Sequence, residues 1–379
     1  MKIPPSSIEV EDSPVPGVKR PVFVLGIVSF LTDISSEMVY PLVPLFLTSV
    51  LGAPLAAVGL IEGVAESTAS LVKTVSGWLS DRLRMRKPLV LTGYALSAAA
   101  KPLMAAANAW PAVLGVRFAD RLGKGIRTAP RDALVADVTP AHLWGRAYGF
   151  HRAADTLGAV VGPAIGLGLL TALDDDFRAV FLIALAPAAA GVLLLTLVGE
   201  VRPEGARGGA PITRHGAQGL GPTFWLFLAI SLVFALGNSS DAFLILRSKN
   251  LGLSNAETVS AYVAFNAVYA LSAMPAGIVS DRLGRRNIIG AGFALFALVY
   301  LGFALAFSPA WAWPLFATYG FYMALTEGVG RALVVDSVPA SRRATALGIY
   351  TGAMGGMILL SSILAGALWD QVGPRAPFF

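Results

Sequence analysis

The sequence predicts an all-α integral membrane protein made of two pseudo-symmetric bundles of transmembrane helices. Of the 379 residues, 55% are hydrophobic and 14% are charged, with a mean hydropathy of +0.68. This is more apolar and less charged than an ordinary soluble domain. The apolar residues gather in runs long enough to cross a bilayer, and short sequence markers recur about 200 residues apart. Composition, runs and repeat together indicate a helical membrane protein with an internal duplication.

The apolar runs predict eleven transmembrane helices. A spanning helix needs about 20 predominantly apolar residues, and the connectors between the runs are short and contain turn-forming Gly, Pro or Asn. The predicted helices cover residues 22–50, 55–80, 88–107, 111–137, 143–172, 177–199, 222–248, 255–280, 287–307, 311–336 and 342–369.

A stretch rich in Gly, Pro and Arg divides the chain in two. Residues 200–221 lack apolar periodicity and predict a linker between a six-helix bundle, 21–199, and a five-helix bundle, 222–379. Residues 1–20 are polar and Pro-rich, without the apolar core of a signal peptide, and predict a disordered tail. Lys and Arg collect in the loops on the side of this tail and linker. The positive-inside rule therefore places both in the cytoplasm, and we expect a multi-pass protein of the plasma (inner) membrane.

The composition also bears on partners and cofactors. Without cysteine, and with three scattered histidines, the sequence offers no disulfide framework, thiol nucleophile or metal cluster. We expect no cofactor other than a proton as coupling ion, no catalytic residue and no enzyme activity. The net charge of +6 lies in short loops rather than in one basic patch, which argues against a nucleic-acid partner. The expected partners are membrane lipid and a small-molecule substrate, bound by a monomer.

Three sequence markers repeat in register. Ser-Asp-Arg-Leu at residues 80–83 recurs at 280–283, Leu-Gly at 51–52 recurs at 251–252, and Asp-x-x-Pro at 137–140 recurs at 336–339. Two repeats of the same orientation place a substrate site at their interface near the bilayer midplane. The second repeat is one helix short of the first, so we expect either a truncated chain or a bundle that closes with five helices.

With these features the chain resembles the major facilitator superfamily along nearly its whole length. The loops after the second and eighth helices match that family's motif A, G-x-L-x-D-R-x-G-R-[KR], and an acid at the end of the fourth helix joins the same charge relay. The resemblance implies that these residues latch the two halves in one state; the alternative is that the arginines only anchor the positive side. The gating residues are Gly77, Asp81, Arg82, Arg86 and Asp137, with Gly277, Asp281, Arg282, Arg285 and Asp336 as their repeats.

The fifth helix matches the family's antiporter motif, G-x8-G-x3-G-P-x2-G. Small residues at this spacing let helix backbones approach closely, and the proline adds a kink. By resemblance this motif marks exporters that exchange substrate for protons; the alternative is generic packing of small residues. The matching residues are Gly149, Gly158, Gly162, Pro163 and Gly166.

Many charges lie in the fourth predicted helix, 111–137. At about 2.5 to 3.5 kcal/mol per charge near a helix centre, they cannot face lipid. Helical spacing places Asp120, Lys124, Arg127 and Arg131 on one stripe, with Arg117 and Arg121 beside it. We expect this stripe to line the substrate path in a helix interrupted at its glycines and Pro130. The alternative is that the helix starts late and much of the stretch is a cytoplasmic loop.

Other helices supply acids that could meet these bases. A carboxylate in a low-dielectric cavity can carry a proton, and protonation and substrate would then compete for the same basic partners. For each acid, a fixed structural ion pair is the competing interpretation. The candidate proton carriers are Asp33, Glu37, Glu62, Glu66 and Asp155, and Arg152 and Asp241 join the candidate path.

The leading hypothesis is a secondary transporter that works by alternating access and exports a small organic solute by proton antiport. Because the bases of the fourth and fifth helices outnumber their acids, an anionic or zwitterionic substrate is favoured, although drug exporters also bury charge. Two alternatives stay open. One is proton symport for uptake of an organic anion, and the other is a receptor or sensor on the same fold that transports nothing.

Overall fold

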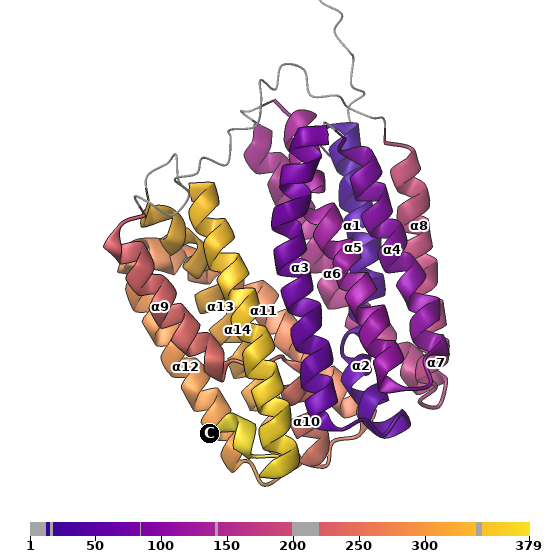
Figure 1. Ribbon diagram of the computed structural model, residues 1–379, viewed down its shortest axis with the longest axis vertical. Coiled ribbons are helices and arrows are strands. Elements are labelled where there is room, and N and C mark those ends of the chain that lie inside the picture. The colour runs from indigo at the N-terminus through magenta and orange to yellow at the C-terminus, as the bar shows by residue number, and fades with distance from the viewer. Residues whose placement is uncertain (1–12, 16–17, 84, 141–142, 199–219, 339–342) are drawn as a thin grey trace, which may run out of the picture.

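The computed structural model describes residues 13–15, 18–83, 85–140, 143–198, 220–338 and 343–379, and this part of the chain is helical without a strand. Eleven helical traverses lie where the sequence predicts them (Figure 1). In chain order they are α1 (Arg20–Val39) with α2 (Leu42–Leu45) and a π-helical turn (Phe46–Val50), α3 (Leu55–Leu83), α4 (Lys87–Ala106), α5 (Trp110–Asp137), α6 (Trp144–Ala172), α7 (Phe177–Ile183) with α8 (Leu185–Thr196), α9 (Pro222–Gly237) with α10 (Ala242–Asn250), α11 (Asn255–Leu283), α12 (Arg285–Leu305), α13 (Ala312–Asp336) and α14 (Arg343–Gln371).

The helices form two bundles, α1 to α8 and α9 to α14, which lie side by side in Figure 1. Nine stretches of the described chain are long and apolar enough to cross a membrane. The traverses α5 and α13 are not among them; α5 is the helix that carries the dense charges predicted for 111–137. Of the predicted tail, 1–20, the structure describes only 13–15 and 18–20, and of the predicted linker, 200–221, only 220–221.

The molecule has two ends, which we name by a residue at each. The Arg20 end is where α1 begins, α8 ends and α9 begins, at the top of Figure 1, and the Leu55 end is where α3 begins and α14 ends. The two bundles meet chiefly through α3 with α14 and α6 with α11. Towards the Leu55 end these backbones approach closely, since a Cβ on Gly366 of α14 would lie 2.5 Å from the Leu55 carbonyl oxygen.

Helix breaks lie at three places where unbroken helices were predicted, one of them at Ala184 between α7 and α8. The predicted helix 22–50 breaks at Tyr40 and Pro41, where proline lacks the N–H that continues a helix. The predicted helix 222–248 breaks at 238–241, so that α9 and α10 are two half-helices. Discontinuous helices at corresponding positions of two repeats are typical of transporter binding sites.

The expected break in the fourth helix is wrong. Helix α5 runs without interruption from Trp110 to Asp137, which also excludes the alternative of a late start. Its glycines serve packing instead. A Cβ on Gly123 would lie 2.6 Å from the Gly93 carbonyl oxygen of α4, and one on Gly125 would lie 2.7 Å from Val72 Cβ of α3. Close packing on both sides holds α5 in place between α3 and α4.

Candidate substrate-binding cavity

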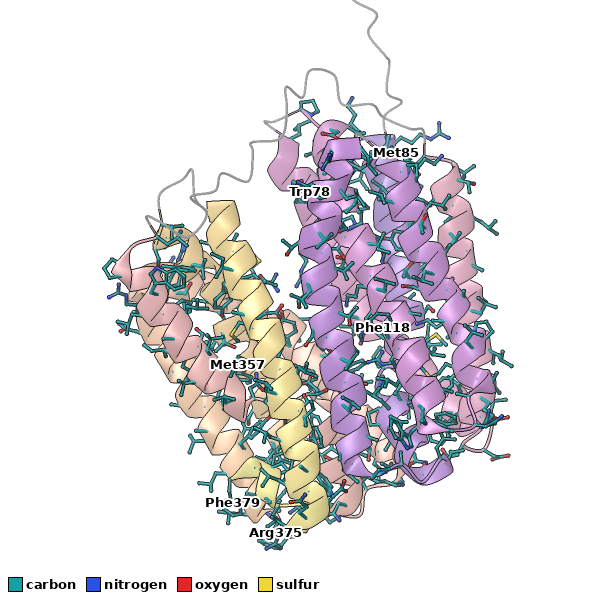
Figure 2. All side chains as sticks on the ribbon, viewed as in Figure 1. Trp78, Met85, Phe118, Met357, Arg375 and Phe379 are labelled. Atoms are coloured by element: carbon teal, nitrogen blue, oxygen red, sulfur yellow. The ribbon has the colours of Figure 1, made fainter. Side chains whose placement is uncertain are left out.

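The charged helix α5 keeps its charges away from its outward face. Gly115 and Phe118, about one turn apart, are exposed on that face, and Figure 2 labels Phe118 there. Arg117, Arg121 and Arg127 are all at most 7% exposed. This is the arrangement expected from the high cost of a charge against lipid.

Part of the charge on α5 forms a closed cluster inside the first bundle. Arg117 Nη2 donates to both carboxylate oxygens of Glu62 at 2.9 and 2.8 Å, and Arg117 Nη1 lies 3.9 Å from Asp120. Lys101 of α4 lies 3.5 Å from the other oxygen of Asp120. Two acids and two bases thus balance one another, and none of the four lines the central cavities described below.

This cluster holds three of the predicted site residues away from the central cavities. Glu62, Arg117 and Asp120 were expected to carry protons or line the path, yet all three are buried in the ion-pair cluster. The physical reason is Lys101, whose charge draws Asp120 towards α4. The face of α5 that lines the cavities instead carries Arg121, Lys124, Arg127, Thr128 and Arg131.

Two adjoining cavities lie between the bundles. The first, about 410 Å³, is named the Arg152 cavity; six basic and four acidic residues line it, namely Lys73, Lys124, Arg127, Arg131, Arg152, Arg331, Asp33, Glu66, Asp155 and Glu327. The second, about 380 Å³, is named the Asp241 cavity; its charged lining is Arg121, Lys124, Arg331, Glu37, Glu66, Asp241 and Glu327. Both bundles contribute to each, so the predicted site at the repeat interface has a physical location.

Several of the lining bases already have partners. Arg121 Nη1 lies 3.5 Å from Glu66, and Arg131 lies 3.0 Å from Asp132 and 3.9 Å from Asp155. The guanidinium of Arg127 donates to Ser97 Oγ and lies 4.6 Å from the centre of the Tyr94 ring. These side chains are held in place by the first bundle.

Three lining bases are left over. Among the described residues, Lys73, Lys124 and Arg152 have no carboxylate within 4 Å, and all three are exposed. On the acidic side, Asp33 and Glu37 of α1 likewise have no ion-pair partner in the described chain. The predicted candidates for anion binding and proton transfer therefore line two adjoining cavities, which share Lys124 and Glu66.

The antiporter-motif glycines of α6 pack against the helix that carries these two acids. A Cβ on Gly158 would lie 2.9 Å from Asp33 Cβ, and one on Gly162 would lie 2.9 Å from Glu37 Cβ. A Cβ on Gly166 would lie 2.7 Å from the Met38 carbonyl oxygen. The glycines therefore let α1 and α6 touch along the stretch that carries the two carboxylates. Pro163 lies inside α6 in the same stretch. The surroundings of Gly149 fall outside the described part of the structure.

The second bundle contributes hydroxyl-bearing side chains that the sequence analysis did not single out. Tyr319 donates to Asp241 at 2.8 Å, and Tyr269 donates to Glu327 at 2.6 Å. Asn238, at the end of α9, donates to Tyr322 at 3.1 Å, while its buried Oδ1 has no partner in the described residues. A polar run, Asn-Ser-Ser-Asp, in the middle of an apolar stretch was the signal for this break.

The gating residues lie at the Arg20 end, where two ion pairs between described side chains each join parts of one bundle. Arg86 Nε lies 3.2 Å from Asp137, and Arg285 Nη1 lies 2.7 Å from Asp336 in the repeat. Neither pair links the two bundles. Of the other predicted gating residues, Arg82 lies over the Trp78 ring at 5.3 Å, and Arg282 is exposed. A Cβ on Gly77 would lie 3.2 Å from Ala129 Cβ, and a Cβ on Gly277 would have nothing within 4 Å. The side chains of Asp81 and Asp281 fall outside the described part of the structure.

Metal binding finds no support in the described residues, which contain no group of three or more potential ligands.

Two membrane-embedded helical bundles around a charged central cavity define a membrane transporter.

A family model for the Major Facilitator Superfamily matches residues 25–254 and 226–379. The chain belongs to the Major Facilitator Superfamily, and it is a transporter rather than an enzyme. An uncharacterized MFS-type transporter of Methanocaldococcus jannaschii is 36% identical over 368 residues, which cover 95% of this chain and 91% of that protein.

Solved structures show the same fold. The nucleoside transporter NupG is similar with a TM-score of 0.75 at 14% identity, over 95% of this chain and 94% of that one. A bacterial homolog of the human lysosomal transporter Spinster, inward-facing and unoccupied, is similar with a TM-score of 0.72 at 18% identity, over 92% and 81% of the two chains. At these identities the likeness concerns the fold alone.

Proposed function

We propose that this transporter is a proton-coupled antiporter that exports a small organic solute carrying an anionic group. It acts as a monomer in the plasma membrane, with its Arg20 end in the cytoplasm. One observation carries the proposal. The two adjoining cavities contain the bases Lys124 and Arg152 without a carboxylate partner, and the acids Asp33 and Glu37 without a basic partner, among the described residues.

Lys124 and Arg152 supply the anion site. Both bases line the Arg152 cavity and have no carboxylate within 4 Å among the described residues. A carboxylate or phosphate can be bound by the guanidinium of Arg152 through two parallel hydrogen bonds, with the ammonium of Lys124 as a point charge.

Asp33 and Glu37 supply the proton sites. Asp33 shares the Arg152 cavity with Lys124 and Asp155, and Glu37 shares the Asp241 cavity with Lys124 and Arg121. While these carboxylates are charged, they can also accept hydrogen bonds from a donor group of the solute, and protonation removes that capacity. A proton and the solute then bind alternately at these acids rather than together, as antiport requires.

The packing of α6 on α1 supports exchange over simple binding. The motif glycines hold the Asp33 and Glu37 backbone against α6, so a change in the charge of either acid acts on a helix contact inside the first bundle. Movement of one bundle against the other about a fixed central site is how two-repeat transporters alternate access.

Reconstitution tests this proposal. A metabolite and drug susceptibility screen of a deletion strain identifies candidate solutes, which are then offered to proteoliposomes with an imposed pH gradient. Antiport predicts solute uptake when the interior is more acidic than the medium, because protons leave as the solute enters. Uptake with the opposite gradient would instead indicate symport, and binding without flux would indicate a receptor.

The cavity bases give the test its specificity. Replacing Lys124 or Arg152 by alanine should weaken solute binding about tenfold or more, the scale of a charge-assisted hydrogen bond. Lys249→Ala is the matched control, because Lys249 lies in the last turn of α10 and lines neither cavity. Unchanged affinity in both cavity variants would contradict the anion site.

A further inference from the structure

The charges around the two cavities are unevenly distributed. The Arg152 cavity has six basic and four acidic lining residues, whereas the Asp241 cavity has three basic and four acidic ones. In the Asp241 cavity, Arg121 is held by Glu66 and Arg331 by Glu327. This leaves Glu37 and Asp241 facing Lys124 alone. The lining of the Arg152 cavity is therefore net positive, and the lining of the Asp241 cavity is net negative.

The helix break between α9 and α10 places acceptor groups at the Asp241 cavity. Helix α9 ends at Gly237 with the negative end of its dipole, while the positive end of α10 begins at Ala242 beside the acidic Asp241. The buried Oδ1 of Asn238, next along the chain, is an acceptor without a partner among the described residues. Among the described residues, the carboxylate of Asp241 accepts one hydrogen bond, from Tyr319, which leaves acceptor capacity on its oxygens.

Tyrosine rings complete the surroundings. Tyr40, Tyr262 and Tyr319 line the Asp241 cavity, with the Tyr40 and Tyr262 ring centres 5.9 Å apart. Carboxylates, amide and hydroxyl oxygens and aromatic faces together bind ammonium groups.

An apolar pocket adjoins the Asp241 cavity. It has a volume of about 230 Å³ and shares Asn238, Glu327 and Arg331 with that cavity. Its walls include Phe227, Phe234, Phe293 and Tyr350. A flat apolar group fits such a wall.

We propose that the transported solute is zwitterionic: its ammonium group binds at Asp241 and Asn238, its anionic group at Lys124 and Arg152, and its apolar body against the aromatic pocket. This rests on the proposed function, because it assumes that the solute occupies the central cavities. It adds a second charged group of the solute, the ammonium, and thereby specifies the class of substrate.

Equilibrium binding to the purified chain tests directly whether the ammonium group is recognised. The probes are phenyl-substituted aminoalkanoic acids of increasing chain length, each with its matched amine lacking the carboxylate and its matched acid lacking the nitrogen. At least one zwitterion of the series should bind wild-type protein about tenfold more tightly than its matched amine or acid. Asp241→Asn should remove this advantage without weakening the binding of the matched acid, which also shows that the variant is folded.

The control is Asp174→Asn, an exposed loop position at φ 50°, a conformation that asparagine adopts readily. Zwitterion and acid binding equally well, equal losses of both in Asp241→Asn, or no binding by any zwitterion would each overturn the inference. The binding assay uses no pH gradient. Acids that bind without their zwitterions but still exchange for protons would refute this inference alone, and zwitterions that bind without any proton exchange would refute only the antiport.

Discussion

Asp370, near the end of α14, accepts hydrogen bonds from the backbone N–H groups of Leu55 and Ala56 at 3.1 and 2.8 Å. An acid of the second bundle thus caps the first turn of α3 in the first bundle. A negative group at a helix N-terminus is stabilising. The contact therefore holds the bundles together at the Leu55 end.

Removing this cap should favour separation of the bundles at the Leu55 end. Asp370→Ala loses a contribution of about 1 kcal/mol, roughly a fivefold change in the equilibrium between conformations. The chain has no cysteine, so spin labels on cysteines introduced at Ala172 and Val372, both exposed at this end, report the distance between the bundles. A longer-distance population should grow in the variant.

Asp176→Ala is the matched control for this experiment. Asp176 caps α7 within the first bundle by accepting from Arg178 and Ala179 at 3.0 and 3.1 Å. Its loss costs a cap of the same kind without touching the contact between bundles. An unchanged distance distribution in Asp370→Ala, or an equal change in Asp176→Ala, would refute the assignment.

The Glu62–Arg117 pair should matter for stability rather than for transport. Arg117→Ala leaves Glu62, which is 1% exposed, without its cation, and we expect a loss of about 3 to 5 kcal/mol. Replacing both residues, by Arg117→Met with Glu62→Leu, removes both charges and should recover most of that loss. Thermal unfolding of the two variants checks this expectation. A double variant as unstable as the single one would show that the loss of stability does not come from the unpaired charge of Glu62.

The α1–α6 contact should be intolerant of a single methyl group. In Gly162→Ala the new Cβ would lie 2.7 Å from the Ile34 carbonyl oxygen and 2.9 Å from Glu37 Cβ, which forces the helices apart at a cost of about 1 to 3 kcal/mol. We expect reduced thermal stability and a loss of proton-driven transport. Gly168→Ala, on the same helix, has nothing within 4 Å and should behave like the wild type; equal effects of the two would argue against the contact.

The fold was largely predictable because membrane helices are long apolar runs separated by turn residues. The predicted runs and the observed helices differ by only a few residues at most ends. The charges of α5 were correctly kept away from lipid, since the cost of exposing them is large. Packing decided the rest: the glycines of α5 that suggested a break are contact points with α3 and α4.

The details of the site depended on partners from other helices. Asp120 was placed on the path by its spacing along α5, but Lys101 of α4 draws it away, and one helix's periodicity contains no information about its neighbours. Tyr319 beside Asp241 was missed for the same reason. The capping role of Asp370 joins residues 315 positions apart, a relation that only the folded chain reveals.

The most direct test of the account compares two modes of transport in Asp33→Asn and Glu37→Gln proteoliposomes. Exchange of labelled for unlabelled solute requires only the anion site and alternating access, whereas accumulation driven by an acidic interior also requires proton release. The double variant should keep exchange and lose gradient-driven accumulation, and the single variants should show which of the two acids carries the proton. Full gradient-driven accumulation in the double variant would contradict it.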